Sequence, residues 1–188
     1  MRSLTNIVVF CGSRIGVDPA AAEVTKELGT TMADRGIGLI YGGASIGLMG
    51  CIADTVLEHG GRVVGVLPED LPNEIAHPGL TELHSVPDMH TRKRKMYELA
   101  DAAIALPGGL GTLDEIFETA TWTQLGMHSA PMPIAMLGAN GYWDSLGQLL
   151  DRSLADGFVD SVWRDSITSV DSPVDALRHC ADWLAPGE

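Results

Sequence analysis

The sequence predicts an α/β fold in which helices cover both faces of a parallel sheet, built as a single domain over residues 1–188. Short apolar runs alternate along the chain with segments of helical periodicity, which is the pattern of strands joined by crossover helices. The strand-like runs are apolar on both faces, as expected for parallel strands that are covered on two sides. The length suits one domain with a sizeable core.

Local signals support the individual elements. Asp18 is suited to cap the first helix, Pro19 fits its first position and Gly36 closes it. The predicted strands are residues 6–11, 37–41, 62–67, 81–86, 101–106, 133–137 and 167–170. The predicted helices are residues 19–35, 47–59, 88–100, 112–127, 142–157 and 173–184. Residues 68–79 contain three prolines and are expected to form a surface loop.

The charge balance narrows the classes of partner. The formal net charge is −13, and a chain this acidic lacks the basic face that nucleic-acid binding requires. We therefore expect no nucleic-acid partner. Four of the 12 basic residues are nevertheless consecutive, at Arg92, Lys93, Arg94 and Lys95.

The cysteines, histidines and apolar segments exclude several other classes. The three cysteines are widely spaced and form no CxxC pair, and the histidines show no metal-ligand spacing, so we expect no metal site. The apolar run near the N-terminus is too short for a signal peptide, and no apolar stretch reaches about 18 residues. The sequence thus predicts a cytoplasmic protein without a membrane partner.

Residues 107–115 (PGGLGTLDE) form the most informative loop, because ligands of parallel sheets bind where strands end. Three glycines in four positions let the backbone approach a ligand, and the following helix N-terminus attracts an anion such as a phosphate. The loop matches neither GxGxxG nor a P-loop. An alternative remains: Thr112 as N-cap and Glu115 as the third helical residue would form a capping box. The box and a catalytic role compete for the same Glu115 carboxylate.

Two further segments are candidates for the site. Residues 41–50 (YGGASIGLMG) follow a strand and open a helix, where Gly47 and Gly50 share one face; a plain tight turn is the alternative. Residues 89–95 (MHTRKRK) place cations in the first turn of a helix, against its dipole, which is easier to understand if an anion binds there. The alternative is a solvated basic face, and at most one or two of the four cations can face a cleft.

Together and in this order, the three segments resemble the LOG ("Lonely Guy") family of cytokinin riboside 5′-monophosphate phosphoribohydrolases. PGGxGTxxE is matched by residues 107–115, YGGxxxGLMG by residues 41–50 and MHxRK by residues 89–93. Residues 11–13 and residues 122–128 are similar as well. The resemblance covers nearly the whole chain to about residue 160.

The resemblance implies a Rossmann-like, doubly wound fold and a homodimer that holds a nucleotide between the glycine loops. The four tryptophans of an otherwise aromatic-poor chain also favour a dimer. In the family the catalytic pair corresponds to Arg92 and Glu115. The substrate-binding positions implied by the resemblance are Gly12, Ser13, Gly42, Gly43, Met89, Lys93, Gly108, Gly109, Gly111 and Thr112.

The activity that this resemblance implies is hydrolysis of the N-glycosidic bond of N6-modified adenosine 5′-monophosphates, which releases the free base and ribose 5-phosphate. Glu115 would stabilise positive charge on the sugar or activate a water, whereas Arg92 would orient the nucleotide, pair with Glu115 or assist departure of the base. Two alternatives stay open: a broader AMP or nucleoside-monophosphate glycosidase, and a non-catalytic nucleotide or cofactor carrier. A dinucleotide oxidoreductase is least favoured because GxGxxG is missing.

Relatives of this kind are often labelled lysine decarboxylases, and the sequence argues against that activity. A pyridoxal phosphate enzyme needs a Schiff-base lysine. The chain has only Lys26, Lys93 and Lys95, of which the first lies on a helix away from the strand ends and the others lie in the basic run. We therefore expect no cofactor.

Overall fold

A computed structural model describes residues 3–70 and 76–185 of the chain. In these ranges seven parallel strands form one sheet in the order β4-β3-β2-β1-β5-β6-β7. The strands are β1 (Asn6–Phe10), β2 (Gly38–Tyr41), β3 (Val63–Pro68), β4 (Glu82–Val86), β5 (Ala102–Ala105), β6 (Ile134–Leu137) and β7 (Ile167–Val170). The helices are α1 (Ala20–Asp34), α2 (Gly47–Glu58), α3 (Met89–Leu99), α4 (Leu110–Gln124), α5 (Asp144–Ala155), α6 (Ser161–Asp165) and α7 (Pro173–Leu184). The predicted parallel α/β fold is confirmed.

Most element boundaries agree with the sequence prediction to within one or two residues. The prediction for the helix after the glycine loop is wrong at both ends, because α4 begins at Leu110 rather than at residue 112 and ends at Gln124 rather than at residue 127. The prediction also missed α6, a helix too short for a periodic pattern. Part of the predicted loop over residues 68–79 lies outside the described residues. No helix among the described residues is long and apolar enough to cross a membrane.

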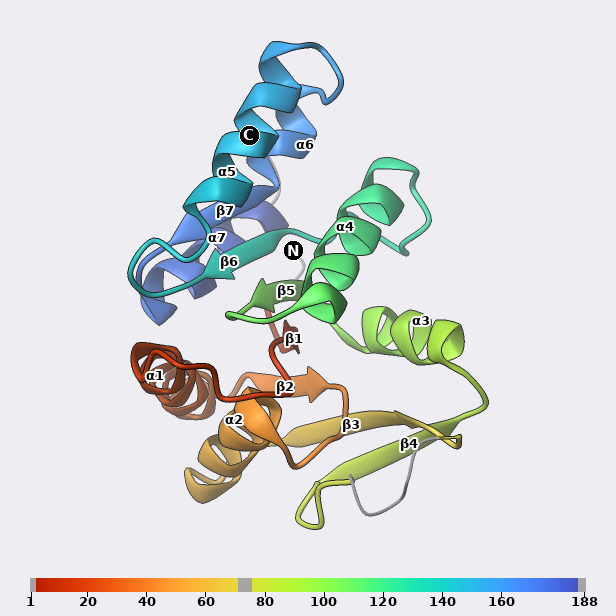
Figure 1. Ribbon diagram of the computed structural model, residues 1–188. Coiled ribbons are helices and arrows are strands. Elements are labelled where there is room, and N and C mark those ends of the chain that lie inside the picture. Colours follow the sequence, from red (N-terminus) through yellow and green to blue (C-terminus); the bar gives the residue numbers. More distant parts are fainter. Residues whose placement is uncertain (1–2, 71–75, 186–188) are drawn as a thin grey trace.

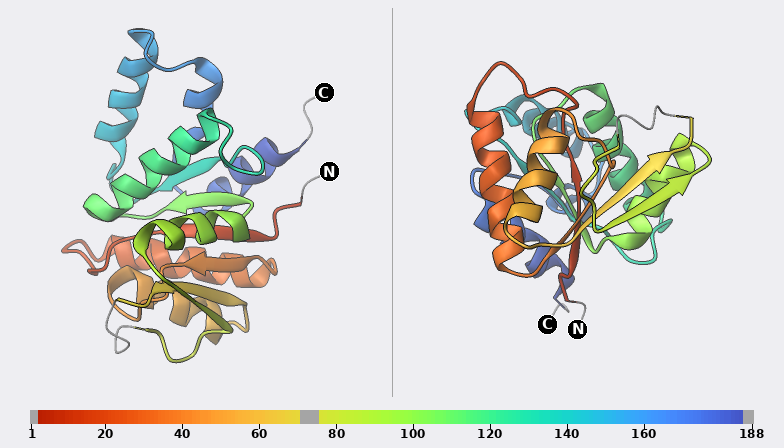
Figure 2. Two further views of the ribbon diagram at one scale, coloured as in Figure 1. Left: turned by 90° about the vertical axis from the view of Figure 1, so that its right-hand side faces the viewer. Right: turned by 90° about the horizontal axis from the view of Figure 1, so that it is seen from below.

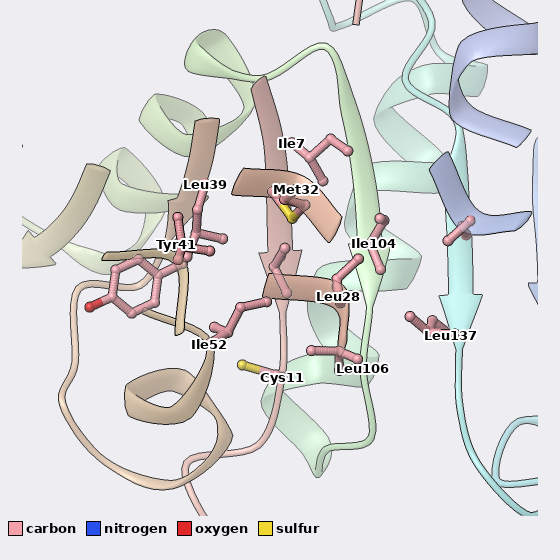
Figure 3. Close-up of a cluster of buried hydrophobic side chains, with 14 of the residues drawn as sticks. Ile7, Cys11, Leu28, Met32, Leu39, Tyr41, Ile52, Ile104, Leu106 and Leu137 are labelled. Atoms are coloured by element: carbon pink, nitrogen blue, oxygen red, sulfur yellow. The ribbon is translucent and has the colours of Figure 1, made fainter. Parts of the chain in front are cut away.

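The core has two layers, one on each face of the sheet (Figures 1 and 2). On one face, α1, α2 and α7 pack against alternate strand residues such as Ile7 and Leu39. Figure 3 shows this layer, with Leu28 and Met32 of α1 lying over the central strands. On the other face, α3, α4 and α5 pack against the intervening strand residues, such as Val8. The sheet is therefore doubly wound, as the resemblance implies.

The chain reverses its direction of winding at β1. It proceeds outward from β1 through β2 and β3 to β4, and then returns through α3 to place β5 on the other side of β1. The loops after β1 and β5 therefore separate toward opposite faces of the sheet and leave a crevice at their carboxyl ends. A cavity of about 640 Å³ lies there, between these two loops. This crevice is the place in the fold where a ligand is expected.

Candidate active site

The N-terminus of α4 lies in the PGGLGTLDE loop and carries no side-chain cap. Gly109 is the N-cap residue, and it has no side chain that could accept a hydrogen bond from the first turn of this helix. Thr112 is therefore the third residue of the helix rather than its N-cap, and Glu115 is the sixth. The capping-box interpretation is wrong, because Glu115 lies more than one turn inside the helix. The Glu115 carboxylate is thus free for another role.

Two helices in the described part of the chain carry a side-chain cap, whereas α1, α2, α5 and α6 lack one as α4 does. The Asp88 side chain caps α3, where its Oδ1 accepts a hydrogen bond from the Thr91 amide at 2.8 Å, and Ser172 caps α7. The hydrogen bonds from the Thr91 amide and hydroxyl hold the pKa of Asp88 below its ordinary value. At α4, in contrast, the N–H groups and the positive end of the helix dipole face the crevice without a protein carboxylate, which is the arrangement of an anion site.

Glycines bring the loops after β1 and β5 into direct contact. The Gly12 amide donates to the Pro107 carbonyl at 3.0 Å, and a Cβ on Gly12 would lie 3.4 Å from Gly108 Cα. A Cβ on Gly108 would overlap Thr112 Oγ1 and approach the Gly12 amide to 2.9 Å. A side chain on Gly108 would displace the buried Thr112 or the Gly12 amide, whereas a Cβ on Gly12 is limited mainly by the Arg14 carbonyl at 3.1 Å. The predicted Gly12 and Gly108 therefore serve close packing of the two loops that form the crevice.

The YGGASIGLMG turn packs against the same loops. Gly43 and Gly47 have positive φ angles of 80° and 58°, and a Cβ on Gly47 would overlap the Ser13 backbone. The Leu48 amide donates to the Gly12 carbonyl at 3.1 Å. The structural interpretation of this segment as a tight turn is confirmed for Gly43 and Gly47. It does not account for Gly42, whose φ is not positive.

Gly42 makes room for Arg92. A Cβ on Gly42 would overlap Nη2 of the Arg92 guanidinium. The guanidinium is fixed from two other directions, because Nε donates to the Val66 carbonyl of β3 at 3.1 Å and Nη1 lies 3.1 Å from Met89 Sδ. Of the predicted site residues, Met89 thus contacts the Arg92 guanidinium and Gly42 leaves space for it. Arg92 is half-buried and held over the end of the sheet.

Glu115 extends from α4 toward the same region. Burial raises its pKa from 4.5 to about 7, Arg92 and Lys93 act in the opposite direction, and the negative charges of Asp114 and Glu118 raise it further. Glu115 and Arg92 also influence the pKa of Cys11 at the end of β1, which burial raises above its ordinary range. The fold therefore brings the two predicted catalytic residues together from α3 and α4. Among the described residues no ion pair within 4 Å joins them.

The four consecutive cations separate, as their helical spacing requires. Lys93 is buried, and its ammonium lies 3.0 Å from Asp114 Oδ2 and 2.9 Å from Glu118 Oε2. Arg94 is exposed and lies over the Trp122 ring, whereas Lys95 is half-buried. Burial lowers the pKa of Lys93, but the bonds to Glu118 and Asp114 raise it more, so that the net shift is upward. Its charge is thus compensated inside the protein.

The cavity is lined by part of the predicted site. Gly12, Ser13, Gly108 and Gly109 lie in its wall, whereas Arg92 and Glu115 are not among its lining residues. Sequence reasoning missed Tyr142, which also lines the cavity and whose hydroxyl donates to the Gly108 carbonyl at 2.6 Å. Its position in the loop after β6, at the same edge of the sheet, was the available signal.

Solved structures with this fold include molybdenum cofactor proteins. A molybdenum cofactor binding protein from Rippkaea orientalis superposes with a TM-score of 0.71 at 19% identity, over 98% of this chain and 99% of that one. The molybdenum cofactor carrier protein of Chlamydomonas reinhardtii gives a TM-score of 0.72 at 21% identity, over 98% and 100%. At these identities the similarity establishes the fold alone, a Rossmann-like one.

Curated relatives are more similar in sequence. LOG1 of Arabidopsis thaliana, a cytokinin riboside 5′-monophosphate phosphoribohydrolase, is 42% identical over 179 residues, which are 95% of this chain and 83% of that protein. Probable LOGL1 of rice (Oryza sativa subsp. japonica) is 44% identical over 92% of this chain and 77% of its own. The Rhodococcoides fascians enzyme is 40% identical over 92% and 89%.

A family model described as "possible lysine decarboxylase" matches residues 49–180. That description differs from the names of the curated relatives, and the surroundings of Lys26 and Lys93 do not support it. Lys26 is exposed on α1, and Lys93 is bound to two carboxylates that favour its protonated form, whereas a Schiff base requires a neutral amine. With about 40% identity to the phosphoribohydrolases over more than nine-tenths of its length, the chain belongs to the LOG family.

Proposed function

We propose that the protein hydrolyses the N-glycosidic bond of N6-modified adenosine 5′-monophosphates, which releases the free base and ribose 5-phosphate. The observation that carries the proposal is the joint placement of an uncapped helix N-terminus and a free carboxylate on one helix, α4. The relatives named as phosphoribohydrolases support the same activity.

The geometry of α4 relates the phosphate to the reacting bond. The helix rises about 1.5 Å per residue, so Glu115 lies about 4–5 Å along the axis from Thr112 in the first turn. A 5′-phosphate held by the amides of Gly109, Gly111 and Thr112 would direct the sugar toward Glu115. Binding energy from this remote anchor can then position the anomeric carbon.

The charges of Glu115 and Arg92 suit a reaction in which the ribose ring becomes positively charged. As the bond to the base breaks, positive charge develops on the ribose ring, and the ionised Glu115 carboxylate stabilises that charge or takes a proton from the attacking water. A pKa of about 7 suits a group that must accept a proton near neutral pH. The Arg92 guanidinium, fixed by Val66 and Met89, provides a positive charge that opposes the effect of burial and favours the ionised form of Glu115.

The test is an assay with AMP and N6-isopentenyl-AMP that measures free base and ribose 5-phosphate, with Glu115→Gln as the inactive control. We expect release from N6-isopentenyl-AMP by the wild type. Equal turnover of AMP would favour the broader nucleoside-monophosphate glycosidase. Tight binding of both nucleotides without any release would favour a carrier and contradict the proposed hydrolysis.

We also propose a homodimer that involves α4. The tryptophans are weak support for it, since Trp143 is buried and none of the four is exposed. A better argument is an apolar stripe along α4, because Leu110 and Phe117 are 86% and 43% exposed and Leu125, which follows the helix directly, is 65% exposed. Leu110 and Phe117 are seven residues apart, about two helical turns, which puts these two on one face. Such a stripe is typical of a protein interface.

The three cysteines are free thiols, as expected in the reducing cytoplasm, where we place the protein. Its net charge of −13 favours small-molecule partners over nucleic acid. That the 188 residues form one domain stays a prediction.

A further inference from the structure

Lys93 connects the two helices that carry Arg92 and Glu115. Figures 1 and 2 show α3 and α4 next to each other on one face of the sheet. Between them, Lys93 Nζ lies 3.0 Å from Asp114 Oδ2 and 2.9 Å from Glu118 Oε2. Tyr97, one turn further along α3, donates its hydroxyl to the same Glu118 oxygen at 2.8 Å. Two side chains of α3 therefore converge on the carboxylates of α4.

The connection lies directly beside the two proposed catalytic residues. Lys93 follows Arg92 in α3, and Asp114 precedes Glu115 in α4. The lysine side chain is only 8% exposed, and that of Glu118 is 18% exposed, so solvent screens this pair weakly. The ammonium has both carboxylates as partners. A nucleotide phosphate would have to compete with both for it, although the sequence predicts Lys93 as a substrate ligand.

We propose that Lys93 is a positioning residue rather than a phosphate ligand: by binding Asp114 and Glu118 it holds α3 against α4 and so sets the position of Arg92 relative to Glu115. The inference rests on the proposed glycosidic hydrolysis for its kinetic consequences. A displacement of about 1 Å between reacting groups can lower the rate up to about a hundredfold. An ion pair that fixes α3 against α4 therefore affects turnover although Lys93 does not contact the substrate.

Lys93 also affects the charge at Glu115. The titratable and charged groups that act on or respond to Glu115 are Arg92, Lys93 and Tyr97 on α3, Cys11 directly after β1, and Asp114 and Glu118 on α4. Lys93 lowers the pKa of Glu115 and Glu118 raises it. Loss of the lysine must therefore move the titration of Glu115 to higher pH, and loss of the Glu118 charge must move it to lower pH.

The experiment compares the wild type with Lys93→Met, Glu118→Gln and the double variant, with Lys95→Met as the matched control on the same helix. For Lys93→Met we expect kcat to fall by at least about tenfold while the Kd for AMP changes by less than about threefold. The acidic limb of its kcat–pH profile should move to higher pH, and that of Glu118→Gln should move to lower pH. In the double variant the acidic limb of the kcat–pH profile should return toward that of the wild type. Its kcat should stay low, because the ion pairs between Lys93 of α3 and the carboxylates of α4 are still absent. Lys95→Met should resemble the wild type.

Two results would overturn the inference. One is a Lys93→Met variant that binds AMP much more weakly at unchanged kcat, as a phosphate ligand would. The other is a pH limb that does not move. If Lys93→Met does not fold, Asp114→Asn combined with Glu118→Gln releases the same lysine from α4 and must lower kcat likewise. The titration of Glu115, followed by carboxyl ¹³C NMR, requires no turnover, so the expected shifts can be read even if a wild type without base release refutes the proposed function.

Discussion

At the scale of single residues, protonation of the Glu115 carboxyl group affects both the stability of the fold and the proposed reaction. Its pKa of about 7 in the folded protein is above the ordinary 4.5, so the folded state binds the proton more tightly than the unfolded chain does. This contribution to stability is fully present below pH 4.5 and is lost as pH rises through 7. Ionisation of Glu115 therefore costs stability at the pH where the carboxylate is needed.

Glu115→Gln separates these two effects. We expect the variant to be at least as stable as the wild type at pH 8, by up to about 3 kcal/mol, because it no longer carries a charge at this half-buried position. The difference should vanish toward pH 4. Turnover should fall at least about a hundredfold, since Gln provides no negative charge, while AMP still binds. Melting curves at several pH values and base release on the same preparation measure both; full activity would remove Glu115 from the mechanism.

Gly42→Ala tests whether the space at Gly42 positions the Arg92 guanidinium for the reaction. The new Cβ would overlap the end of a flexible side chain rather than backbone, so we expect the guanidinium to move and the fold to persist. Base release should fall by about tenfold to a hundredfold. Gly147→Ala is the control, since a Cβ there meets only Ser169 Oγ at 3.6 Å. If Gly42→Ala keeps full activity, the position of Arg92 does not matter for turnover.

At the scale of elements, the uncapped N-terminus of α4 is the proposed site of the substrate phosphate. Gly109 has space around a Cβ and no positive φ, so an aspartate can occupy the N-cap. We expect Gly109→Asp to stabilise the protein by about 0.5 kcal/mol and to lower kcat/KM at least about a hundredfold, because its carboxylate takes the place of the phosphate. Gly109→Ala, which lacks the charge, should lose far less.

The same element predicts the form of the substrate. The wild type should cleave the 5′-monophosphate with a kcat/KM at least about a hundredfold above that of the matching nucleoside, since only the nucleotide can use the α4 amides. In Gly109→Asp this preference should largely disappear. Comparing both substrates with both proteins measures it, and an equal preference in the two proteins would place the phosphate elsewhere.

At the scale of the whole molecule, the exposed stripe on α4 predicts how copies associate. Phe117→Glu should weaken the dimer by at least about thirtyfold, because it puts a charge in the middle of an apolar interface. Leu149→Glu is the matched control: Leu149 is 57% exposed but lies on α5, outside the stripe, so this variant should stay dimeric. Sedimentation measures both, and a wild type that is monomeric at micromolar concentration would refute the dimer.

The order of strands and helices could be predicted because it depends on local periodicity. All seven strands lie where the apolar runs predict them, and α7 begins and ends at the predicted residues. The start of α4 could not be placed, since both Thr112 and Gly109 are acceptable N-cap residues, and the packing of Gly108 against Gly12 favours the second. That packing joins residues almost a hundred positions apart.

The sequence by itself determined the parallel sheet and the glycine loops at its carboxyl edge, because residue type and spacing are properties of one short segment. The resemblance to the LOG family added the pair Arg92 and Glu115 as candidates. Only the tertiary structure decided what these residues do to one another. It showed that Glu115 is not a cap, that Gly42 makes room for Arg92 and that the charge of Lys93 is taken up by Asp114 and Glu118. The physical reason is that burial and charge act through space, so a pKa or an ion pair depends on side chains from several elements at once.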